Sequence, residues 1–466
     1  MSTQMTKDLK KTIETVKQQK AIPTVSGAFD NGVILEMIYR PEDRQTAFVV
    51  WQDGKWSYES SFPIDSSHRL VPYSPNNNLL KNQIVQFPSG VEEYNSEDAL
   101  VNEIQGFLHR YVDVSPLFEK IASYYVLFTW VYDGFNELPY LRVRGDYGSG
   151  KTRFLLTLGS LCYKPIFASG ASTVSPIFRI LNEFKGTLIV DEADFRFSDE
   201  KAEMVKILNN GNVKGFPVLR SEATGNKEFS PRAYHVFGPK LVATRGHFED
   251  RALESRFLTE EMGHNRLRED IPINLPSTYQ EEALRIRNKL LLFRFRNLGK
   301  RQANADLVDR SIEPRLNQIF VPLLSIIEDA KAREDILRLA RHYNREIIAD
   351  RGMDMEAQVL EIIRDLAAAS ENPTLSIKDI TGWFSDRYGA DYDRKITTKW
   401  VGYIIRKKLN LKTQKSHGVF VIPLSEMPKM ERLCERYGVS PQGTLEPRDV
   451  TNQQKPADFG ELGDMK

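Results

Sequence analysis

The chain has 466 residues and a mass of 53.5 kDa, enough for about three domains at the usual ~150 residues per domain. Its 64 basic and 63 acidic side chains give a formal charge of +1, so any affinity for nucleic acid must come from local patches. Two cysteines, Cys162 and Cys434, exclude a multi-cysteine zinc site and favour a reducing compartment over a disulfide framework.

The N-terminal segment and the most apolar run bear on location. The N-terminal segment has no apolar stretch of the kind that forms a signal peptide. The run YYVLFTWVY at 124–132 is far shorter than the roughly 20 residues of a membrane helix, so we expect it in a buried helix. The sequence therefore predicts a cytoplasmic protein without a membrane partner.

Five regions follow one another along the chain. Residues 1–26 are expected to form a polar helix or tail. Residues 27–96 alternate apolar and polar side chains between turn residues, which is typical of a small mostly-β unit. Residues 97–350 interleave helical patterns with short apolar strands and predict an α/β core with a helical lid. A further small domain at 351–425 precedes a short helix and a tail, rich in Pro and Gly, at 426–466.

A glycine-rich stretch, GDYGSGKT, stands between the apolar strand pattern LRV and the helical pattern TRFLLTLGSL. This strand–loop–helix context is that of a P-loop. Glycines let backbone N–H groups turn toward a phosphate, Lys151 reaches the β- and γ-phosphates, and the Thr152 hydroxyl ligates magnesium. ATP and Mg²⁺ are the expected cofactors, held by Gly145, Asp146, Tyr147, Gly148, Ser149, Gly150, Lys151 and Thr152.

The stretch GTLIVDEADF at 186–195 supplies the second carboxylate-bearing strand that a P-loop needs. Asp191 is predicted to hold magnesium and Glu192 to polarise the attacking water, which fits hydrolysis of the nucleotide. An acidic loop after a buried strand is the structural alternative. The letters DEAD at 191–194 do not indicate an RNA helicase of the DEAD-box type, because neither a Ser-Ala-Thr motif nor a second recA-like domain is present.

The elements that follow are a helix ending near Leu208, a hairpin at about 216–237, the apolar strand KLVAT at 240–244 and a short helix that ends in an arginine. This order resembles the ATPase core of AAA+ proteins. It is most similar to ring helicases of the superfamily-three and minichromosome-maintenance type and to related replication ATPases of mobile elements. The resemblance covers about residues 110–350.

The resemblance implies roles for residues after the second strand. It implies a sensor at Thr244 and, in the tripeptide SRF, an arginine finger at Arg256, with Arg251 as the second candidate. Such a finger acts on the nucleotide of a neighbouring copy, so the resemblance also implies self-association, commonly as a hexamer. Salt bridges to nearby acidic residues are the alternative for both arginines. The chain departs from the family pattern in having threonine where asparagine is common, followed by Arg245 instead of proline.

Two further assignments depend on the same resemblance. Arg315, at the start of an apolar-periodic helix, resembles a second sensor that reaches the γ-phosphate; Arg310 competes with it, and a purely structural role is the alternative. The hairpin before the first sensor resembles one that grips DNA in the channel of ring helicases. Lys227 at its predicted turn, flanked by Arg220 and Arg232, would contact phosphates without regard to sequence, unless it only solvates an exposed loop.

Residues 354–422 predict three helices followed by a hairpin, an order that resembles a winged helix. Between Arg394 and Lys415 this segment has eight basic residues and no acidic one. The third helix would face duplex DNA and the wing would meet phosphates, although winged helices also contact proteins. The expected DNA contacts are Lys395, Thr398 and Lys399 on the helix and Lys412 and Lys415 on the wing.

The basic run at 284–302 has leucines and phenylalanines at helical spacing, so we expect a lid or interface helix with a basic outer face. Taken together, these features predict an ATP-hydrolysing DNA motor. It would be a ring-forming replicative DNA helicase or replication initiator of a plasmid, phage or genomic island, with single-stranded DNA in its channel. The alternatives are a nucleotide-dependent regulatory switch with a winged helix, or a helicase loader that binds DNA without separating strands.

Overall fold

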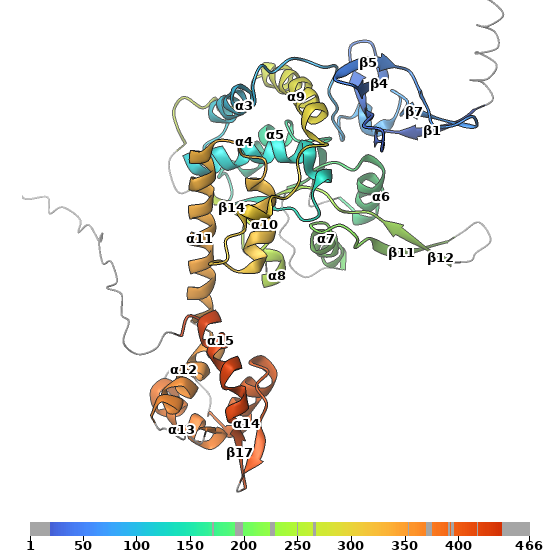
Figure 1. Cartoon of the computed structure of the whole chain (residues 1–466). Coiled ribbons are helices and arrows are strands. Elements are labelled where there is room, and N and C mark those ends of the chain that lie inside the picture. Colours follow the sequence, from blue (N-terminus) through green and yellow to red (C-terminus); the bar gives the residue numbers. More distant parts are fainter. Residues whose placement is uncertain are drawn as a thin grey trace, which may run out of the picture. The chain divides into compact units, whose positions relative to one another are not determined.

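The structure of the protein, a computed structural model, divides into two compact units, Met1–Arg341 and His342–Lys466. Each unit is described by itself, and Figure 1 labels the elements of both. The described residues are 19–169, 172–191, 199–223, 229–248, 250–263, 267–352, 354–369, 375–389, 392, 396–416 and 418–439.

A five-stranded parallel sheet forms the centre of the first unit, in the order β14-β8-β13-β10-β9. Its strands are short apolar runs buried at their middles, as expected for parallel strands covered on both faces. Because all five strands are parallel, their carboxyl ends meet at one edge, where open α/β sheets bind ligands. The strands are β8 (Tyr140–Arg144), β9 (Ile166–Ser169), β10 (Leu188–Asp191), β13 (Lys240–Thr244) and β14 (Phe257–Glu261).

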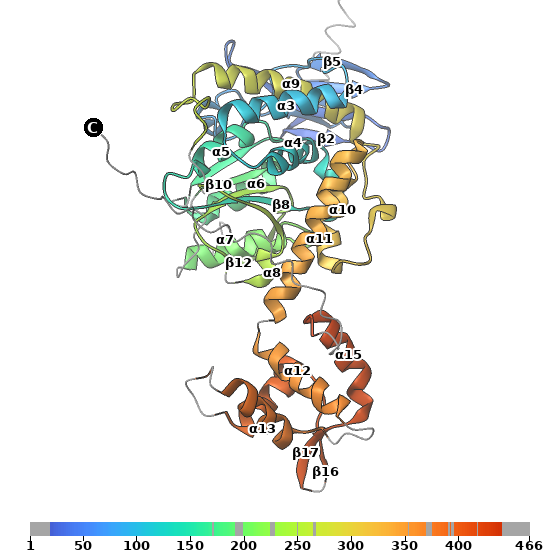
Figure 2. The ribbon, with the colours of Figure 1, turned by 90° about the vertical axis from the view of Figure 1, so that its left-hand side faces the viewer.

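Helices cover the sheet, with α3, α4 and α9 on one side and α7 and α8 on the other in Figure 2. The apolar run expected in a buried helix lies within α4 and is confirmed there. Ser115 caps α4 by accepting from the backbone of Phe118, and the helix is tied to the sheet where the Tyr125 hydroxyl donates to the Lys240 carbonyl over 2.9 Å. The helices of the first unit are α2 (Asn78–Lys81), α3 (Glu97–Tyr111), α4 (Pro116–Val131), α5 (Lys151–Gly159), α6 (Val174–Phe184), α7 (Asp199–Asn210), α8 (Arg251–Glu254), α9 (Thr278–Asn297) and α10 (Pro314–Leu324), and α11 (Ala330–Gly352) crosses the boundary between the units. Within the described part of the chain, no helix has the length and apolar character needed to cross a membrane.

The N-terminal strands form two small sheets, ordered β2-β3-β4-β5 and β1-β7-β6. Residues 20–24, which the sequence pattern placed in a polar helix or tail, form strand β1 instead. They pair in parallel with β7, a partner 48 residues further along the chain. The pattern of apolar and polar residues within a five-residue segment cannot reveal such a distant partner. Pro23 suits the edge position that β1 occupies in its sheet. The strands are β1 (Lys20–Thr24), β2 (Ser26–Ala28), β3 (Ile34–Arg40), β4 (Gln45–Gln52), β5 (Lys55–Glu59), β6 (Phe62–Pro63) and β7 (His68–Pro72).

Helix α9 joins these N-terminal strands to the core. The sequence pattern predicted a basic outer face for this helix, but Arg287 and Arg294 are buried. Arg294 donates to Glu36 of β3 over 2.6 Å and to both carboxylate oxygens of Asp133 over 2.8 and 2.7 Å. The prediction was wrong for these two side chains because the N-terminal strands and the core supply acceptors that the helix sequence alone does not show.

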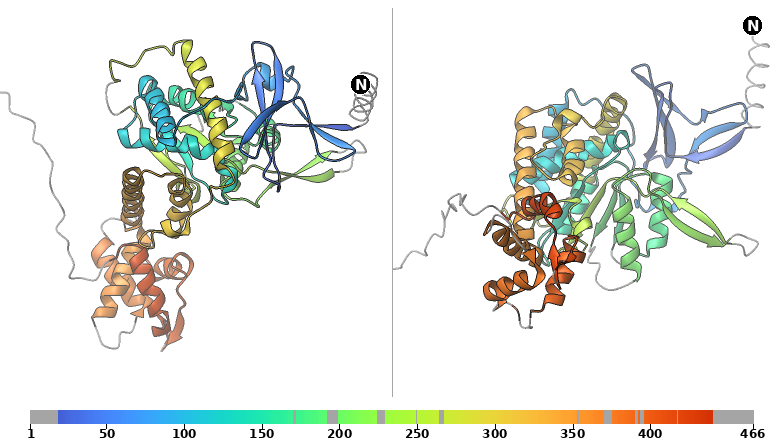
Figure 3. Two further views of the ribbon diagram at one scale, coloured as in Figure 1. Left: turned by 45° about the horizontal axis from the view of Figure 1, so that its top comes forward. Right: turned by 60° about the horizontal axis from the view of Figure 1, so that its bottom comes forward.

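A two-stranded hairpin projects from the first unit in Figure 1 and in both views of Figure 3. Its strands are β11 (Val218–Ala223) and β12 (Phe229–Tyr234), paired in antiparallel register from Val218 opposite Tyr234 to Ala223 opposite Phe229. The hairpin expected at about 216–237 is therefore confirmed, while the residues of its turn lie outside the described part of the chain.

The described part of the second unit contains helices α12, α13, α14 and α15 and a three-stranded sheet in the order β15-β17-β16. Its core is apolar and includes Leu360, Ile380, Phe384 and Ile405. The third helix begins as α14, where Thr397 caps Trp400, and continues as a π-helical turn at Ile404–Lys408. The elements are α12 (Met355–Ala368), β15 (Leu375–Ser376), α13 (Ile377–Tyr388), α14 (Thr398–Tyr403), β16 (Gln414–Ser416), β17 (Val419–Ile422) and α15 (Met427–Arg436).

Candidate active site

The loop between β8 and α5 wraps the N-terminus of α5 at the carboxyl edge of the sheet. Gly150, which caps α5, has a φ of 92°, a left-handed conformation that glycine adopts without strain. At Gly145 a Cβ would lie 2.4 Å from the carbonyl oxygen of Met262, so only glycine fits beside β14. The glycines therefore bring the loop close to the neighbouring strand and leave the N-terminus of α5 open to an anion.

Polar side chains of the first turn of α5 already meet neighbouring groups at the edge of the sheet. The Lys151 ammonium donates to the carbonyl oxygens of Gly145 and Asp146, over 2.7 Å each. The Thr152 hydroxyl donates to Asp191, at the end of β10, over 2.7 Å. A hydroxyl and a carboxylate are the hard oxygen ligands that Mg²⁺ prefers, so these two side chains fit a magnesium ion.

The loop lines a cavity of about 280 Å³. Thr244 ends β13, which lies between β8 and β10. This residue lines the cavity although it is only 1% exposed. Among the described residues its hydroxyl has no hydrogen-bond partner. A buried hydroxyl without a partner is costly, so this group fits a polar ligand in the cavity. The cavity is lined by Tyr147, Gly148, Ser149, Gly150, Lys151, Thr152, Arg153, Asp191, Thr244 and Arg245.

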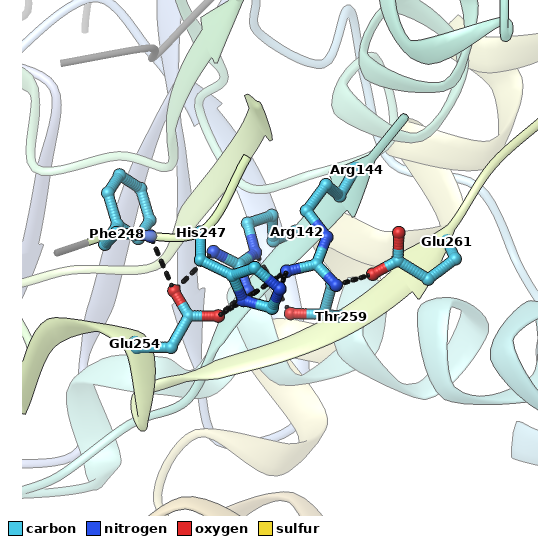
Figure 4. A network of polar contacts seen from close by, with 7 residues as sticks. All are labelled: Arg142, Arg144, His247, Phe248, Glu254, Thr259 and Glu261. Carbon is cyan, nitrogen blue, oxygen red and sulfur yellow. Dashed lines mark hydrogen bonds and ion pairs between the residues drawn. The ribbon is translucent and has the colours of Figure 1, made fainter. Parts of the chain in front are cut away.

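A polar network that joins β8, α8 and β14, drawn in Figure 4, fixes the segment that follows β13. Its centre is Arg142 of β8, 2% exposed, whose guanidinium holds both carboxylate oxygens of Glu254, one of them over 2.8 Å. Arg142 also donates to the Thr259 hydroxyl over 3.0 Å. Glu254 further accepts from the backbone of Phe248 over 2.9 Å and contacts His247 at 3.0 Å.

The network sets the ionisation of Glu254. Burial alone would raise the pKa of Glu254, but the hydrogen bonds and charge of Arg142, assisted by Phe248 and His247, lower the pKa to about 2. A second pair, between Arg144 and Glu261, lies nearer the solvent. The carboxylate of Glu254 therefore ties α8 firmly to β8, the strand that leads into the loop around α5. Sequence reasoning missed this network, since its members are up to 117 residues apart.

The two candidate arginine fingers differ in their exposure to solvent. Arg251, in the first turn of α8, is exposed. Arg256 is half-buried, and its guanidinium donates to the Asn209 side chain of α7. Burial and the neighbouring charge of Arg315 lower the pKa of Arg256.

Neither candidate for the second sensor is among the described residues that line the cavity. Arg315 donates to the Ala252 carbonyl of α8, and Arg310 is exposed. The structure therefore brings Lys151, Thr152, Asp191 and Thr244 together and leaves Arg315 at α8.

The basic residues expected on the hairpin have different surroundings. Arg220 lies over the ring of Phe178, 4.0 Å from its centroid, and pairs with Glu203 at 2.5 Å. These contacts hold the base of the hairpin against α6 and α7. Arg232 lies on the facing strand, with its guanidinium 5.4 Å from the Tyr234 ring centroid. Three other expected site residues, Glu192, Lys227 and Lys395, lie outside the described residues.

The second unit exposes a basic surface on its third helix and hairpin. The expected residues Thr398, Lys399, Lys412 and Lys415 are all exposed. Three further exposed side chains, Tyr403, Arg406 and Phe420, extend this surface, and the Arg406 guanidinium lies over the Phe420 ring at 5.8 Å. Residues 399, 403 and 406 follow one another at helical spacing, which was the signal in the sequence that could have identified them.

Comparison with known proteins finds similarity only among solved structures; no protein-family model and no curated protein matches the chain. One such structure is the apo NrS-1 C-terminal region (12% identity, TM-score 0.37, covering 84% of this chain and 96% of that one). A second is an active helicase, SCCmec type IV Cch (11%, 0.33, 87% and 95%). A third is a full-length MCM homolog from Methanopyrus kandleri (11%, 0.32, 69% and 75%). A helicase and an MCM homolog are thus among the solved structures that this chain is similar to, as the resemblance in the sequence predicted.

Proposed function

We propose that the chain is an ATP-hydrolysing motor that acts on DNA, built from an AAA+ core with a helical lid and a winged helix at 351–425. The observation that carries the ATPase assignment is the hydrogen bond between Thr152, in the first turn of α5, and Asp191, at the end of β10. It joins the hydroxyl and the carboxylate that a P-loop enzyme uses for magnesium, beside Lys151 in one cavity.

Each residue of the cavity has a task in this proposal. Lys151 exchanges its two carbonyl partners for the β- and γ-phosphates, while the backbone N–H groups around Gly150 and the first turn of α5 hold the β-phosphate. Thr152 and Asp191 would hold magnesium, which would neutralise charge at the phosphates. The Thr244 hydroxyl gains a partner by orienting the attacking water. Glu192, adjacent to Asp191 in the sequence, is the base that receives the water proton.

Hydrolysis in a ring needs a positive charge from the neighbouring copy. Of the two candidates, Arg251 is the more accessible to a neighbour because it is exposed, whereas Arg256 is half-buried. We therefore assign the finger to Arg251 and give Arg256 the task of holding α8 against α7. This assignment implies a ring assembly, as the family resemblance suggests. Arg315 contacts α8 as well, because it donates to the Ala252 carbonyl.

Two surfaces are available for DNA. The hairpin β11–β12 carries Lys227 at its predicted turn, and the second unit carries a basic surface around Lys399 and Lys415. The second surface also exposes the rings of Tyr403 and Phe420, which can stack on bases, while its lysines meet phosphates. Attraction of this kind weakens as salt is raised, which separates it from an apolar protein contact.

The deciding experiment measures ATP hydrolysis by the full chain with and without single-stranded DNA, beside Lys151→Ala and Lys227→Ala. We expect DNA to stimulate hydrolysis, Lys151→Ala to abolish it, and Lys227→Ala to remove only the stimulation. Lys331→Ala, an exposed lysine of α11, is the matched control and should behave like the wild type.

Each alternative gives its own result in the same assays. Hydrolysis indifferent to DNA would contradict the motor and favour a regulatory switch. Stimulated hydrolysis without strand separation by the purified protein would indicate a helicase loader. Absence of hydrolysis in the wild type would contradict the ATPase assignment itself.

A further inference from the structure

Two aromatic rings are exposed on the basic surface of the second unit. Tyr403, the last residue of α14, is 52% exposed, and Phe420 of β17 is 51% exposed. Arg406 links them, because it follows Tyr403 at helical spacing and its guanidinium carbon lies 5.8 Å from the Phe420 ring centroid. A Cβ on Gly402 would lie 2.8 Å from the same guanidinium, so this glycine leaves room for Arg406 against the helix. The third helix and β17 therefore present one surface of rings and cations.

Each of the two rings has a lysine beside it. Tyr403 comes four residues after Lys399, so both side chains lie on the same face of α14. Phe420 pairs across the hairpin with Lys415, and directly opposite residues of an antiparallel pair project from the same face of the sheet. The surface thus repeats one unit, a flat ring next to a cation, once on the helix and once on the hairpin.

The charge of this surface has one sign. Residues 394–415 include eight basic side chains and no acidic one. One of these cations, Lys408, lies 3.9 Å from Glu356 of α12. The complementary partner is a polyanion, and rings beside cations favour one whose planar groups can stack, which is nucleic acid. The exposed cations in the described part of this segment are Lys399, Arg406, Lys407, Lys408, Lys412 and Lys415.

The aromatic rings favour one form of nucleic acid. A helix that reads a duplex lies in the major groove and directs polar side chains to the edges of base pairs. Inside a duplex the faces of the bases are stacked on one another, so Tyr403 and Phe420 would find no base to stack on. Unpaired bases expose their faces to such rings. The third helix also forms a π-helical turn at Ile404–Lys408, a feature frequent at functional sites.

We propose that this surface binds single-stranded DNA through unpaired bases, which stack on Tyr403 and Phe420 while Lys399 and Lys415 contact the phosphates. The inference rests on the proposed action on DNA and names the form of DNA that the second unit takes. It differs from the duplex that the winged-helix resemblance implied. A closed duplex meets only the cations of this surface, and a single strand meets both the cations and the rings.

The test compares two strands that differ only in their bases. Binding of fluorescent oligothymidylate and of an abasic strand of the same length to the full chain is measured by anisotropy. All proteins carry Lys227→Ala, which removes the phosphate contact proposed for the hairpin of the first unit. We expect Phe420→Ala to weaken binding of oligothymidylate about tenfold and that of the abasic strand less than about twofold, because only stacking is lost. Lys415→Ala should weaken both equally, since phosphates are common to both strands.

Three further measurements complete the test. Phe420→Trp keeps a ring and should retain affinity, and the fluorescence that it adds should change with oligothymidylate but not with the abasic strand. Trp383→Ala removes another exposed ring, on α13, and should alter neither affinity. A relaxed circular duplex, which has no unpaired ends, should compete less well than unlabelled oligothymidylate. Thermal unfolding of Phe420→Ala should match that of the parent protein, because the ring is exposed.

The outcomes separate this inference from the proposed function. Equal weakening of both strands in Phe420→Ala, or no weakening of either, would overturn the inference, as would a circular duplex that competes as well as oligothymidylate. A wild type that binds neither strand contradicts the proposed action on DNA. A wild type that binds both strands with the same affinity contradicts only the stacking on Tyr403 and Phe420.

Discussion

Replacing Glu254 by glutamine tests whether the network around Arg142 holds α8 in place. The change keeps the shape of the side chain and removes its charge, which leaves a guanidinium only 2% exposed without its carboxylate. The displacement of the Glu254 pKa from 4.5 to about 2 corresponds to about 3 kcal/mol at about 1.4 kcal/mol per pKa unit. Since a quarter of this side chain is exposed, we reduce the value to about 2–3 kcal/mol.

That figure is close to the cost of about 3–5 kcal/mol for removing one partner of a buried ion pair. We therefore expect Glu254→Gln to lower the free energy of unfolding by about 3 kcal/mol, measured by urea denaturation at pH 7. The matched control is Glu261→Gln, which removes a more exposed partner of Arg144 and should cost less than about 1 kcal/mol. If the two variants lose equal stability, or if Glu254→Gln stays within about 1 kcal/mol of the wild type, the reasoning about this network is refuted.

The same variant also has a functional readout. Glu254 is the last residue of α8, the helix that begins with the proposed finger Arg251. Loosening α8 should reduce ATP hydrolysis in the assembled protein more than it reduces nucleotide binding. Equal losses in the two measurements would mean that the network supports the phosphate loop and not the finger.

Three further predictions follow. Thr244→Val should lower kcat for ATP hydrolysis at least about tenfold without lowering stability, because the lost hydroxyl has no partner among the described residues, and Thr244→Ser should retain activity. Tyr403→Ala should weaken binding of single-stranded DNA about tenfold in an anisotropy titration, whereas Trp383→Ala, which removes another exposed aromatic on α13, should not. Because the folded-state pKa of Glu254 is lowered, its contribution to stability is present above pH 4.5 and lost as pH falls toward about 2; Glu254→Gln should show a smaller loss over that window.

The parts of the site that the sequence predicted are formed by residues that are close together in the chain. A strand, a glycine-rich loop and a helix in succession predict the cavity around Lys151, and KLVAT coincides with β13. The predicted helices of the second unit also agree with the structure, because the spacing of apolar residues identifies the buried face of a helix. The predicted helix MEAQVLEIIRDLAA, for example, has the same bounds as α12.

The parts that the sequence did not predict depend on distant partners. The strand order that places β13 between β8 and β10 is set by packing of helices on the sheet and leaves no local mark. The bond from Arg142 to Glu254 spans 112 residues, and the contact of Arg245 with Tyr147 joins two loops. For α9, composition predicted an outer basic face, but burial of Arg294 depends on Glu36, 258 residues away.

The ion pairs of Arg294 have a practical consequence for dissecting the protein. Glu36, in the N-terminal sheet, is one of the two carboxylates that compensate this buried guanidinium, and Lys164, whose pKa burial lowers to about 8, contacts the same Glu36 at 3.3 Å. A shortened chain that starts at α3 would leave two buried cations with a single carboxylate, Asp133, between them. The N-terminal sheet is thus an integral part of the first unit and not a detachable module, so fragments of this protein should retain it together with the core.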